Sequence, residues 1–252
     1  MNSHSERSSR IDVPPNKTRE ENVDEFWFSI QAEVETALRK YVKERYRAYD
    51  PEEQEENYRE ALAGEEALVK ETLMKAERML GERATQGRIL FDVDNTLGRA
   101  AYDSEGENII GFSFRPAALF LLRHLKEKFP SLAIGFLTTR GRQGGVLDQL
   151  RQQDFLGPMS PYVDEREVYS TRDVPERDSM DVEGEYNYLT RHPDVDQAVL
   201  NPENFYGLTP GEISKLEILK NLHERAPDIS TIVVDDQSFP QYLKNGVRAK
   251  YF

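Results

Sequence analysis

Two carboxylates stand at the end of a strongly apolar segment of the chain. In "RILFDVDNTLGRA" the apolar run predicts a buried strand over Ile89–Val93, and Asp92 and Asp94 lie at its carboxyl end, two residues apart. Carboxylates in this arrangement can hold a metal ion or transfer protons. A helix cap or an ordinary loop position is the competing interpretation, because single acids are common after strands.

Polar side chains also follow two other predicted strands. "TIVVDDQ" places Asp235 and Asp236 after one apolar run, and "AIGFLTTRGR" places Thr138 after another. In an open α/β sheet, ligands bind at the carboxyl ends of the strands, where the strand order reverses. We therefore expect the two acidic pairs and the threonine hydroxyl to meet in one crevice.

From residue 87 to residue 252 the chain alternates between predicted strands and predicted helices. The last of these helices opens with Thr209 and Glu212 as a capping box and with Pro210 at its first position. The alternation predicts an α/β fold with a Rossmann-like, mostly parallel sheet and helices on both faces. The expected strands are Ile89–Val93, Leu132–Leu137, Glu167–Ser170, Thr231–Val234 and Val247–Phe252, and the expected helices are Pro116–Lys128, Gly145–Gln153 and Pro210–Glu224.

A helical hairpin is expected before this α/β region, over residues 22–86. From Val23 onward, apolar residues recur at spacings of three and four, as on one face of a helix. Asp50 and Pro51 are typical of the first residues of a second helix.

Two polar segments differ from the rest of the chain. Residues 1–21 are rich in serine, proline, asparagine and charge, and we expect a disordered leader there. Residues 171–208 are acidic, carry few periodic apolar positions and exceed the length of an ordinary connection. We expect this second segment to be an insertion or a lid.

The composition limits the classes of function. The chain has 252 residues, no cysteine and a formal net charge of −13. Thiol nucleophiles, disulfides and zinc–thiolate sites are excluded, and the acidic balance disfavours broad nucleic-acid binding, which relies on basic surfaces. No apolar run approaches the roughly 20 residues of a membrane span, and the first residues lack the apolar core of a signal peptide. We expect a cytoplasmic protein that has no contact with membranes.

With these motifs in order, residues 88–252 resemble the haloacid dehalogenase superfamily. "DVDNTL" is similar to the first motif of that family, D-x-D-x-T followed by a hydrophobic residue, and Asp235 and Asp236 fit the fourth, an acidic pair. Thr138 fits the second motif and Lys215, in "GEISKLEIL", fits the third. The first and fourth motifs are the specific ones, because a threonine after a strand or a lysine on a helix is usually structural.

The resemblance implies a phosphomonoesterase that works through an aspartyl-phosphate intermediate. Asp92 would be the nucleophile, and Asp94 the acid and base that serves the leaving alkoxide and the attacking water. Thr138 would bind a phosphate oxygen, and Lys215 would neutralise the intermediate. Asp94 favours phosphate chemistry over dehalogenation, because a leaving halide needs no proton.

The resemblance also implies a Mg²⁺ centre and a substrate site. The metal ligands would come from Asp92, from the main-chain carbonyl of Asp94 and from the acidic pair, in which Asp236 is preferred to Asp235. The expected substrate contacts lie beside the motifs and are Thr139, Arg140 and Asn95.

Access to this site is expected to be open. Between Leu97 and Pro116 there is room only for a short hairpin flap, and residues 171–208 are too few for a large cap domain. An open site suits a phosphate group on a large molecule, or access shaped by a partner. Arg140 and Arg142 have two interpretations: they bind a second phosphate or a leaving group, or they are ordinary surface-loop arginines.

Two other functions stay open at this point. A phosphotransferase would use the same intermediate, and a non-catalytic binding or scaffolding module would keep the fold and make its contacts through the hairpin. The aromatic stripe of the hairpin, with Trp27, Phe28 and Tyr41, is expected to pack on the core. If the stripe is wider than the core can cover, it becomes a surface for a homodimer or a protein partner.

Overall fold

The structure, a computed structural model, describes residues 17–82, 87–102, 105, 109–173, 182–191, 193–196 and 198–250. Its strands are β1 Gly87–Phe91, β2 Gly98–Tyr102, β3 Ile109–Phe114, β4 Ala133–Thr138, β5 Val168–Ser170, β6 Ser230–Asp235 and β7 Gly246–Arg248. Its helices are α1 Arg19–Arg45, α2 Pro51–Glu82, α3 Ala118–Lys128, α4 Leu147–Gln149, α5 Val182–Leu189, α6 Pro202–Tyr206 and α7 Pro210–Arg225.

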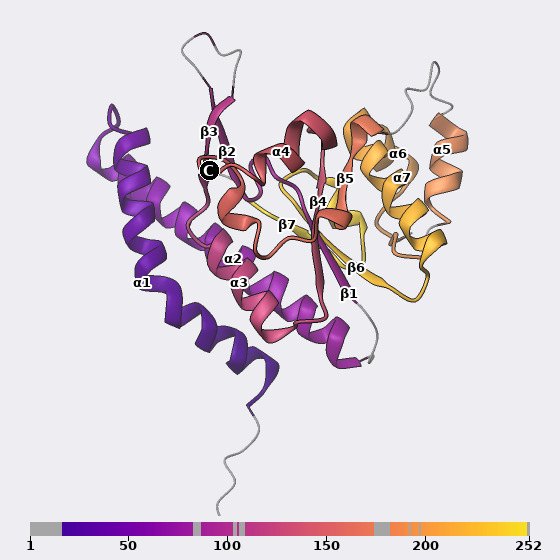
Figure 1. The fold of residues 1–252 in the computed structure, drawn as a ribbon, viewed down its shortest axis with the longest axis horizontal. Coiled ribbons are helices and arrows are strands. Elements are labelled where there is room, and N and C mark those ends of the chain that lie inside the picture. Colours follow the sequence, from indigo (N-terminus) through magenta and orange to yellow (C-terminus); the bar gives the residue numbers. More distant parts are fainter. Residues whose placement is uncertain are drawn as a thin grey trace, which may run out of the picture.

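A parallel sheet of five strands in the order β5-β4-β1-β6-β7 lies at the centre of the fold (Figure 1). Ile89 of β1 lies opposite Ile134 of β4 on one side and opposite Ile232 of β6 on the other. Strands β4 and β5 lie on one side of β1, and the later strands β6 and β7 lie on its other side, so the strand order reverses at β1. A crevice at the carboxyl ends of these strands is the usual ligand site in such a sheet.

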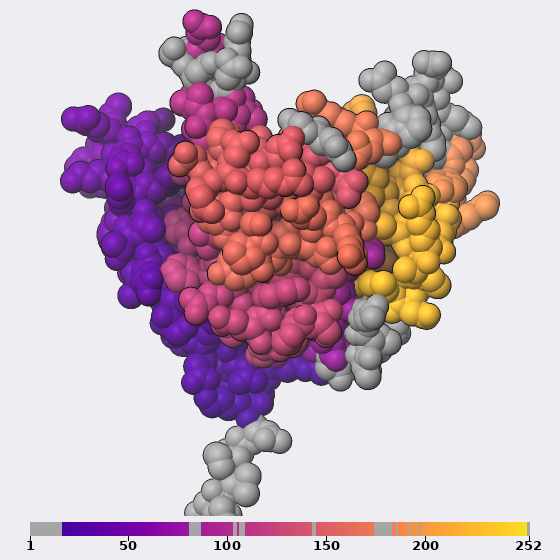
Figure 2. Space-filling view, in the orientation of Figure 1, coloured from indigo at the N-terminus to yellow at the C-terminus, as the bar shows by residue number. Residues whose placement is uncertain are grey.

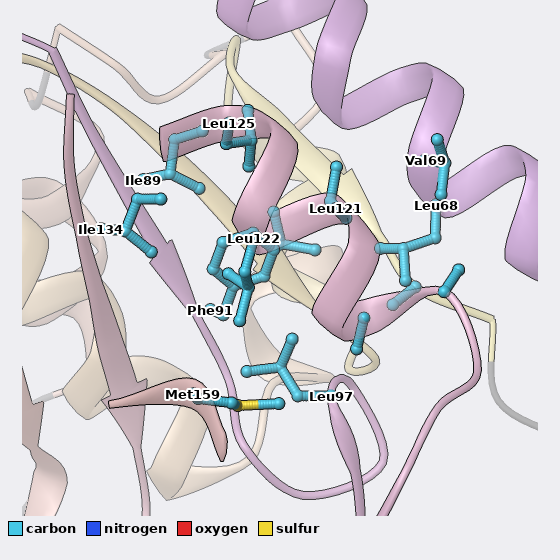
Figure 3. Close-up of a cluster of buried hydrophobic side chains, with 14 of the residues drawn as sticks. Leu68, Val69, Ile89, Phe91, Leu97, Leu121, Leu122, Leu125, Ile134 and Met159 are labelled. Carbon is cyan, nitrogen blue, oxygen red and sulfur yellow. The ribbon is translucent and has the colours of Figure 1, made fainter. Parts of the chain in front are cut away.

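Side chains of each strand alternate between two cores, one on each face of the sheet. Ile89 and Phe91 belong to one buried cluster, whereas Leu90 between them belongs to the other. Figure 3 shows the first cluster, where leucines of α3 and α2 lie beside the side chains of β1 and β4. Helices α5, α6 and α7 cover the second face. The expected α/β fold with helices on both faces is confirmed. The expected strand ends differ from the observed ones by at most four residues, and the end of β5 at Ser170 is the same in both.

The helical hairpin is part of this core. Leu68 and Val69 of α2 are buried in the same cluster as the side chains of β1, and α2 also contacts β6 and β7. Trp27 is buried on the inner face of α1, as expected for the aromatic stripe. Phe28 is 68% exposed, so it does not belong to that stripe. Successive residues on a helix point about 100° apart, which explains why only one of the two aromatic rings faces the core.

Helix α1 begins earlier than expected. Thr18 caps it, and Glu21 closes a capping box with the backbone of Thr18. Residues 19–21, the end of the predicted leader, are therefore helical. Residues 1–16 lie outside the described part of the chain.

The described part of the 171–208 segment is packed on the second face of the sheet. The rings of Tyr186 in α5 and Phe205 in α6 meet edge to face, with 5.5 Å between their centroids. Leu189, Leu200 and Phe205 are buried in the cluster that α7 shares. In its described residues this insertion is thus structural, while residues 174–181 lie outside the described part.

The expected flap after the first strand is a two-stranded antiparallel hairpin, β2 and β3, which stands above the sheet in Figure 1. Its base is tied to α2 by a buried ion pair. Glu65 accepts hydrogen bonds from Nε of Arg115, at 2.7 Å, and from the backbone N–H of Ala117, at 2.8 Å.

Among the described residues, no helix is both long enough and apolar enough to cross a membrane.

Substitution of Glu65 tests whether the helical hairpin is integral to the fold. Glu65→Ala leaves the Arg115 guanidinium buried without this carboxylate, so we expect unfolding free energy to fall by about 3–5 kcal/mol in urea melts. Glu60→Ala, an exposed position on the same helix, is the control and should stay within about 0.5 kcal/mol of the parent. Equal effects of the two substitutions would show that α2 is only loosely attached.

Candidate active site

The ammonium group of Lys215 lies buried between two carboxylates. Its Nζ donates to Oδ1 of Asp92 at 2.9 Å and to Oδ2 of Asp235 at 2.6 Å. All three side chains are almost completely shielded from solvent. Burial alone would lower the pKa of Lys215, but the two carboxylates outweigh it and the pKa is raised, so the lysine stays charged.

Three separate elements bring these groups together. Asp92 follows β1 directly, and its backbone N–H donates to the carbonyl of Val234 in β6 at 2.8 Å. Asp235 is the last residue of β6, while Lys215 lies in the second turn of α7. The parallel pairing of β1 and β6 therefore sets the spacing of the two carboxylates, and α7 brings the cation to them.

A third carboxylate, that of Asp236, completes a group that can hold a metal ion. Among the described residues, one ligand atom each of Asp92, Asp235 and Asp236 lies within 4.8 Å of the other two. Asp236 is less buried than its two partners. Oxygen ligands of this kind suit Mg²⁺, which keeps several waters and binds few carboxylates.

Burial and mutual repulsion disfavour the ionised form of these acids. Burial raises the pKa of Asp92 to about 8, despite the nearby Lys215, and Asp235 adds to the rise. For Asp236, burial and the charge of Asp235 raise the pKa to about 6. The pKa of Asp235 is also raised by burial. One lysine compensates only one of three carboxylates, so the donor set fits a divalent cation, which would supply the missing positive charge.

Asn95 shapes the turn that follows Asp92. It has a positive φ of 60°, and its N–H donates to the carbonyl of Gly98 at 2.7 Å. Asparagine tolerates this left-handed conformation better than most residues. The Asn95 side chain hydrogen-bonds Asp236, which acts to lower the pKa of that acid, and accepts from Nε of Arg99 at 3.2 Å. Asn95, an expected substrate contact, thus contacts the acidic group itself.

Asp94 points to a different partner. Its two oxygens accept from Nε and Nη2 of Arg140, the Nε bond being 2.6 Å long. Arg140 also donates to Gln149 and lies over the ring of Phe112 in the flap, 5.4 Å from the centroid. Arg140 is nearly buried, so in this conformation it binds a protein carboxylate, and its expected contact with substrate stays a prediction.

Thr138 is the last residue of β4, the strand next to β1, and Thr139 follows it. Thr138 is fully buried, and its hydroxyl accepts from the backbone N–H of Arg140 at 3.2 Å. Thr139 is exposed, and its carbonyl accepts from Arg172 at 3.1 Å. The structure thus connects Thr138 to Asp94 through Arg140, whereas Lys215 and the three acids form the tight group. Whether Thr138 contacts a phosphate oxygen stays a prediction.

Glu212 is a positioning residue for this site. One of its oxygens closes the expected capping box with Thr209, and the other accepts from the N–H and hydroxyl of Ser238 and the N–H of Phe239. Burial would raise its pKa, but these hydrogen bonds outweigh it and the pKa is lowered. Glu212 therefore fastens the loop after Asp236 to the start of α7. The capping box was visible in the sequence, but the contact 26 residues away has no local signal.

Comparisons with protein-family models, with curated proteins and with solved structures find no match to this chain. The resemblance to the haloacid dehalogenase superfamily therefore depends on the four sequence motifs alone.

The raised pKa of Asp92 predicts a specific pH dependence of stability. The acid loses its proton near pH 4 in the unfolded chain but only near pH 8 in the folded one, so its contribution favours folding below pH 4 and is lost as pH rises toward 8. Asp92→Asn removes this loss. With chelator present, we expect the melting temperature of the variant relative to the parent to rise steadily between pH 5 and pH 8.

Thermal melts between pH 5 and pH 8.5 measure this difference, with the exposed Asp228→Asn as the control. A difference in melting temperature between Asp92→Asn and the parent that stays constant over this pH range would contradict the assigned environment of Asp92.

Proposed function

We propose that the protein is a Mg²⁺-dependent phosphomonoester hydrolase of the haloacid dehalogenase type, with Asp92 as its nucleophile. The observation that carries the proposal is the approach of Asp92, Asp235, Asp236 and Lys215 to one another at the carboxyl ends of β1 and β6. These are residues of the first, third and fourth motifs. Asp92 of the first motif lies 123 residues before Lys215 of the third, and Asp235 of the fourth lies 20 residues after Lys215.

The proposed reaction has two displacements at phosphorus. A carboxylate oxygen of Asp92 forms a bond to phosphorus while the ester P–O bond breaks, and Asp94 gives the leaving alcohol its proton. Asp94 then accepts a proton from water, whose oxygen attacks phosphorus and breaks the bond to Asp92, releasing phosphate. Lys215 holds Asp92 in position and offsets part of the negative charge of the site.

The ion pair with Arg140 bears on the role of Asp94. A carboxylate that accepts two N–H bonds has lone pairs left for a proton from water, so the pair is compatible with action as a base. To act as an acid, Asp94 must first take up a proton, which weakens its pairing with Arg140. Arg140 is thus suited to positioning Asp94 between the two steps.

The metal would be held by Asp92 and Asp236, with Asp235 beside them. When bound, Mg²⁺ would neutralise charge on the phosphate oxygens. The raised pKa values of Asp92 and Asp236 support this assignment, because carboxylates with strongly shifted pKa values are typical of functional sites.

Two alternatives keep part of this account. A phosphotransferase would pass the phosphoryl group from Asp92 to an acceptor other than water, and the same residues would serve it. A non-catalytic module would bind a phosphorylated ligand without turnover; the presence of both Asp92 and Asp94 favours an enzyme. Four expectations from the sequence stay predictions. They are a phosphorylated substrate, a partner at the helical hairpin, the lack of broad nucleic-acid binding and a cytoplasmic location.

Turnover of para-nitrophenyl phosphate tests the proposal. We expect Mg²⁺-dependent release of nitrophenol that chelator abolishes. Asp92→Asn removes the nucleophile and should lower kcat by at least about 10³-fold, since removing a nucleophile of this kind leaves only binding and electrostatic contributions. Asp228→Asn, an exposed substitution of the same chemistry, should leave kcat unchanged.

Activity that survives Asp92→Asn or ignores chelator would refute the mechanism. If the parent turns over no member of a broad panel of phosphorylated compounds, the binding module becomes the better account.

A further inference from the structure

A hollow of about 320 Å³ lies at the free edge of the sheet, between β5 and the later turns of α7. Figure 2 shows the two parts of the surface side by side, the orange region that contains β5 and the yellow-orange region that contains α7. Three arginines line this hollow, and each comes from a different segment: Arg142 from the π-helical turn after β4, Arg166 from the 3-10 turn before β5, and Arg225 from the last turn of α7.

The carboxylates nearest in sequence to these arginines are paired elsewhere. Within the described residues, no ion pair joins Arg142, Arg166 or Arg225 to an acid. The neighbouring acids form ion pairs with other basic residues, namely Glu165 with Arg151 at 3.7 Å, Glu167 with Arg88 at 2.6 Å and Glu224 with Lys220 at 3.7 Å. In a chain with a net charge of −13, a hollow lined by three such arginines is a local reversal of charge.

Arg142 carries the second observation. Its Nε is buried and has no hydrogen-bond partner among the described residues, and its Nη2 reaches only the carbonyl of Glu165, at 3.4 Å. A buried donor without a partner costs free energy, so Arg142 lies at this hollow without the acceptor that its Nε lacks. Sequence alone left Arg142 between an ordinary loop arginine and a phosphate ligand, and this environment favours the second.

We propose that this hollow binds a phosphate group, separately from the Asp92 centre. Guanidinium groups match phosphate oxygens in charge and in the spacing of their donors. Asn221, also in the wall, adds an amide donor. Asp173 in the same wall is an acceptor that suits a hydroxyl group on the ligand, so the phosphate can be free inorganic phosphate or the phosphoryl end of a small hydroxylated molecule.

The hollow is structurally separate from the candidate active site. β4 lies between β5 and β1 in the sheet, and none of the three arginines contacts Asp92, Asp235 or Asp236 in the described interactions. Binding here therefore does not depend on the proposed hydrolase activity.

Calorimetric titration of the full chain with inorganic phosphate and, separately, with glycerol 3-phosphate tests the proposal. Chelator is present throughout, because the three carboxylates of the Asp92 centre repel phosphate in the absence of a cation. We expect saturable binding of at least one probe with one site per chain. The double substitution Arg142→Gln and Arg225→Gln should raise Kd at least tenfold, and the exposed Arg123→Gln, on α3, should not change it.

Tighter binding of inorganic phosphate would identify the free anion as the ligand, and tighter binding of glycerol 3-phosphate would identify a phosphorylated small molecule. Absence of binding, or equal Kd values for the parent and the double variant, would overturn the proposal. Arg225→Gln alone, at an exposed position, serves if the double variant does not fold, and it should raise Kd severalfold. Loss of para-nitrophenyl phosphate turnover in Asp92→Asn has no bearing on this result, so the two proposals fail independently.

Discussion

Lys215 lies between the carboxylates of Asp92 and Asp235 with almost no access to solvent, and this one buried cation holds together the end of β1, the end of β6 and the start of α7. Burying charged groups is expensive unless they are paired. The pairing here is incomplete, because Asp236 adds a third carboxylate to the same place. Burial and, after it, the neighbouring carboxylates raise the pKa of Asp92 to about 8 and the pKa of Asp236 to about 6. A divalent cation bound here would offset the negative charge of the three acids.

The rest of the fold keeps this centre in register. The strand order reverses at β1, so β1 and β6 lie side by side, although paired residues such as Arg88 and Thr231 are 143 positions apart in the sequence. Glu212 ties the loop after Asp236 to α7, and Arg140 ties Asp94 to the loop after β4. On the face of the sheet opposite to α7, side chains of α2 and α3 pack together in the first core. The helical hairpin thus supports the strands that carry the acids (Figure 3).

Local patterns predicted much of this arrangement. Apolar runs gave all five strands of the parallel sheet, the Thr209–Glu212 capping box gave the start of α7, and the two acidic pairs at strand ends gave the members of the carboxylate group. What depends on contacts between distant residues was not visible. The Asp94–Arg140 pair, the Glu65–Arg115 pair and the second set of hydrogen bonds to Glu212 all join segments that have no sequence relation to one another. The short helices α5 and α6 were missed because helices of eight and five residues show too few turns for a period to stand out.

The central claim is that Asp92 and Asp236, with Asp235 beside them, hold one divalent cation near Lys215. Electron paramagnetic resonance with Mn²⁺ in place of Mg²⁺ tests this claim most directly. The account predicts one bound Mn²⁺ per chain, displaced by excess Mg²⁺, with affinity reduced at least roughly tenfold in Asp236→Asn and unchanged in the exposed Asp148→Asn. The account is contradicted if the parent binds no Mn²⁺, or if Asp236→Asn binds it as tightly as the parent does.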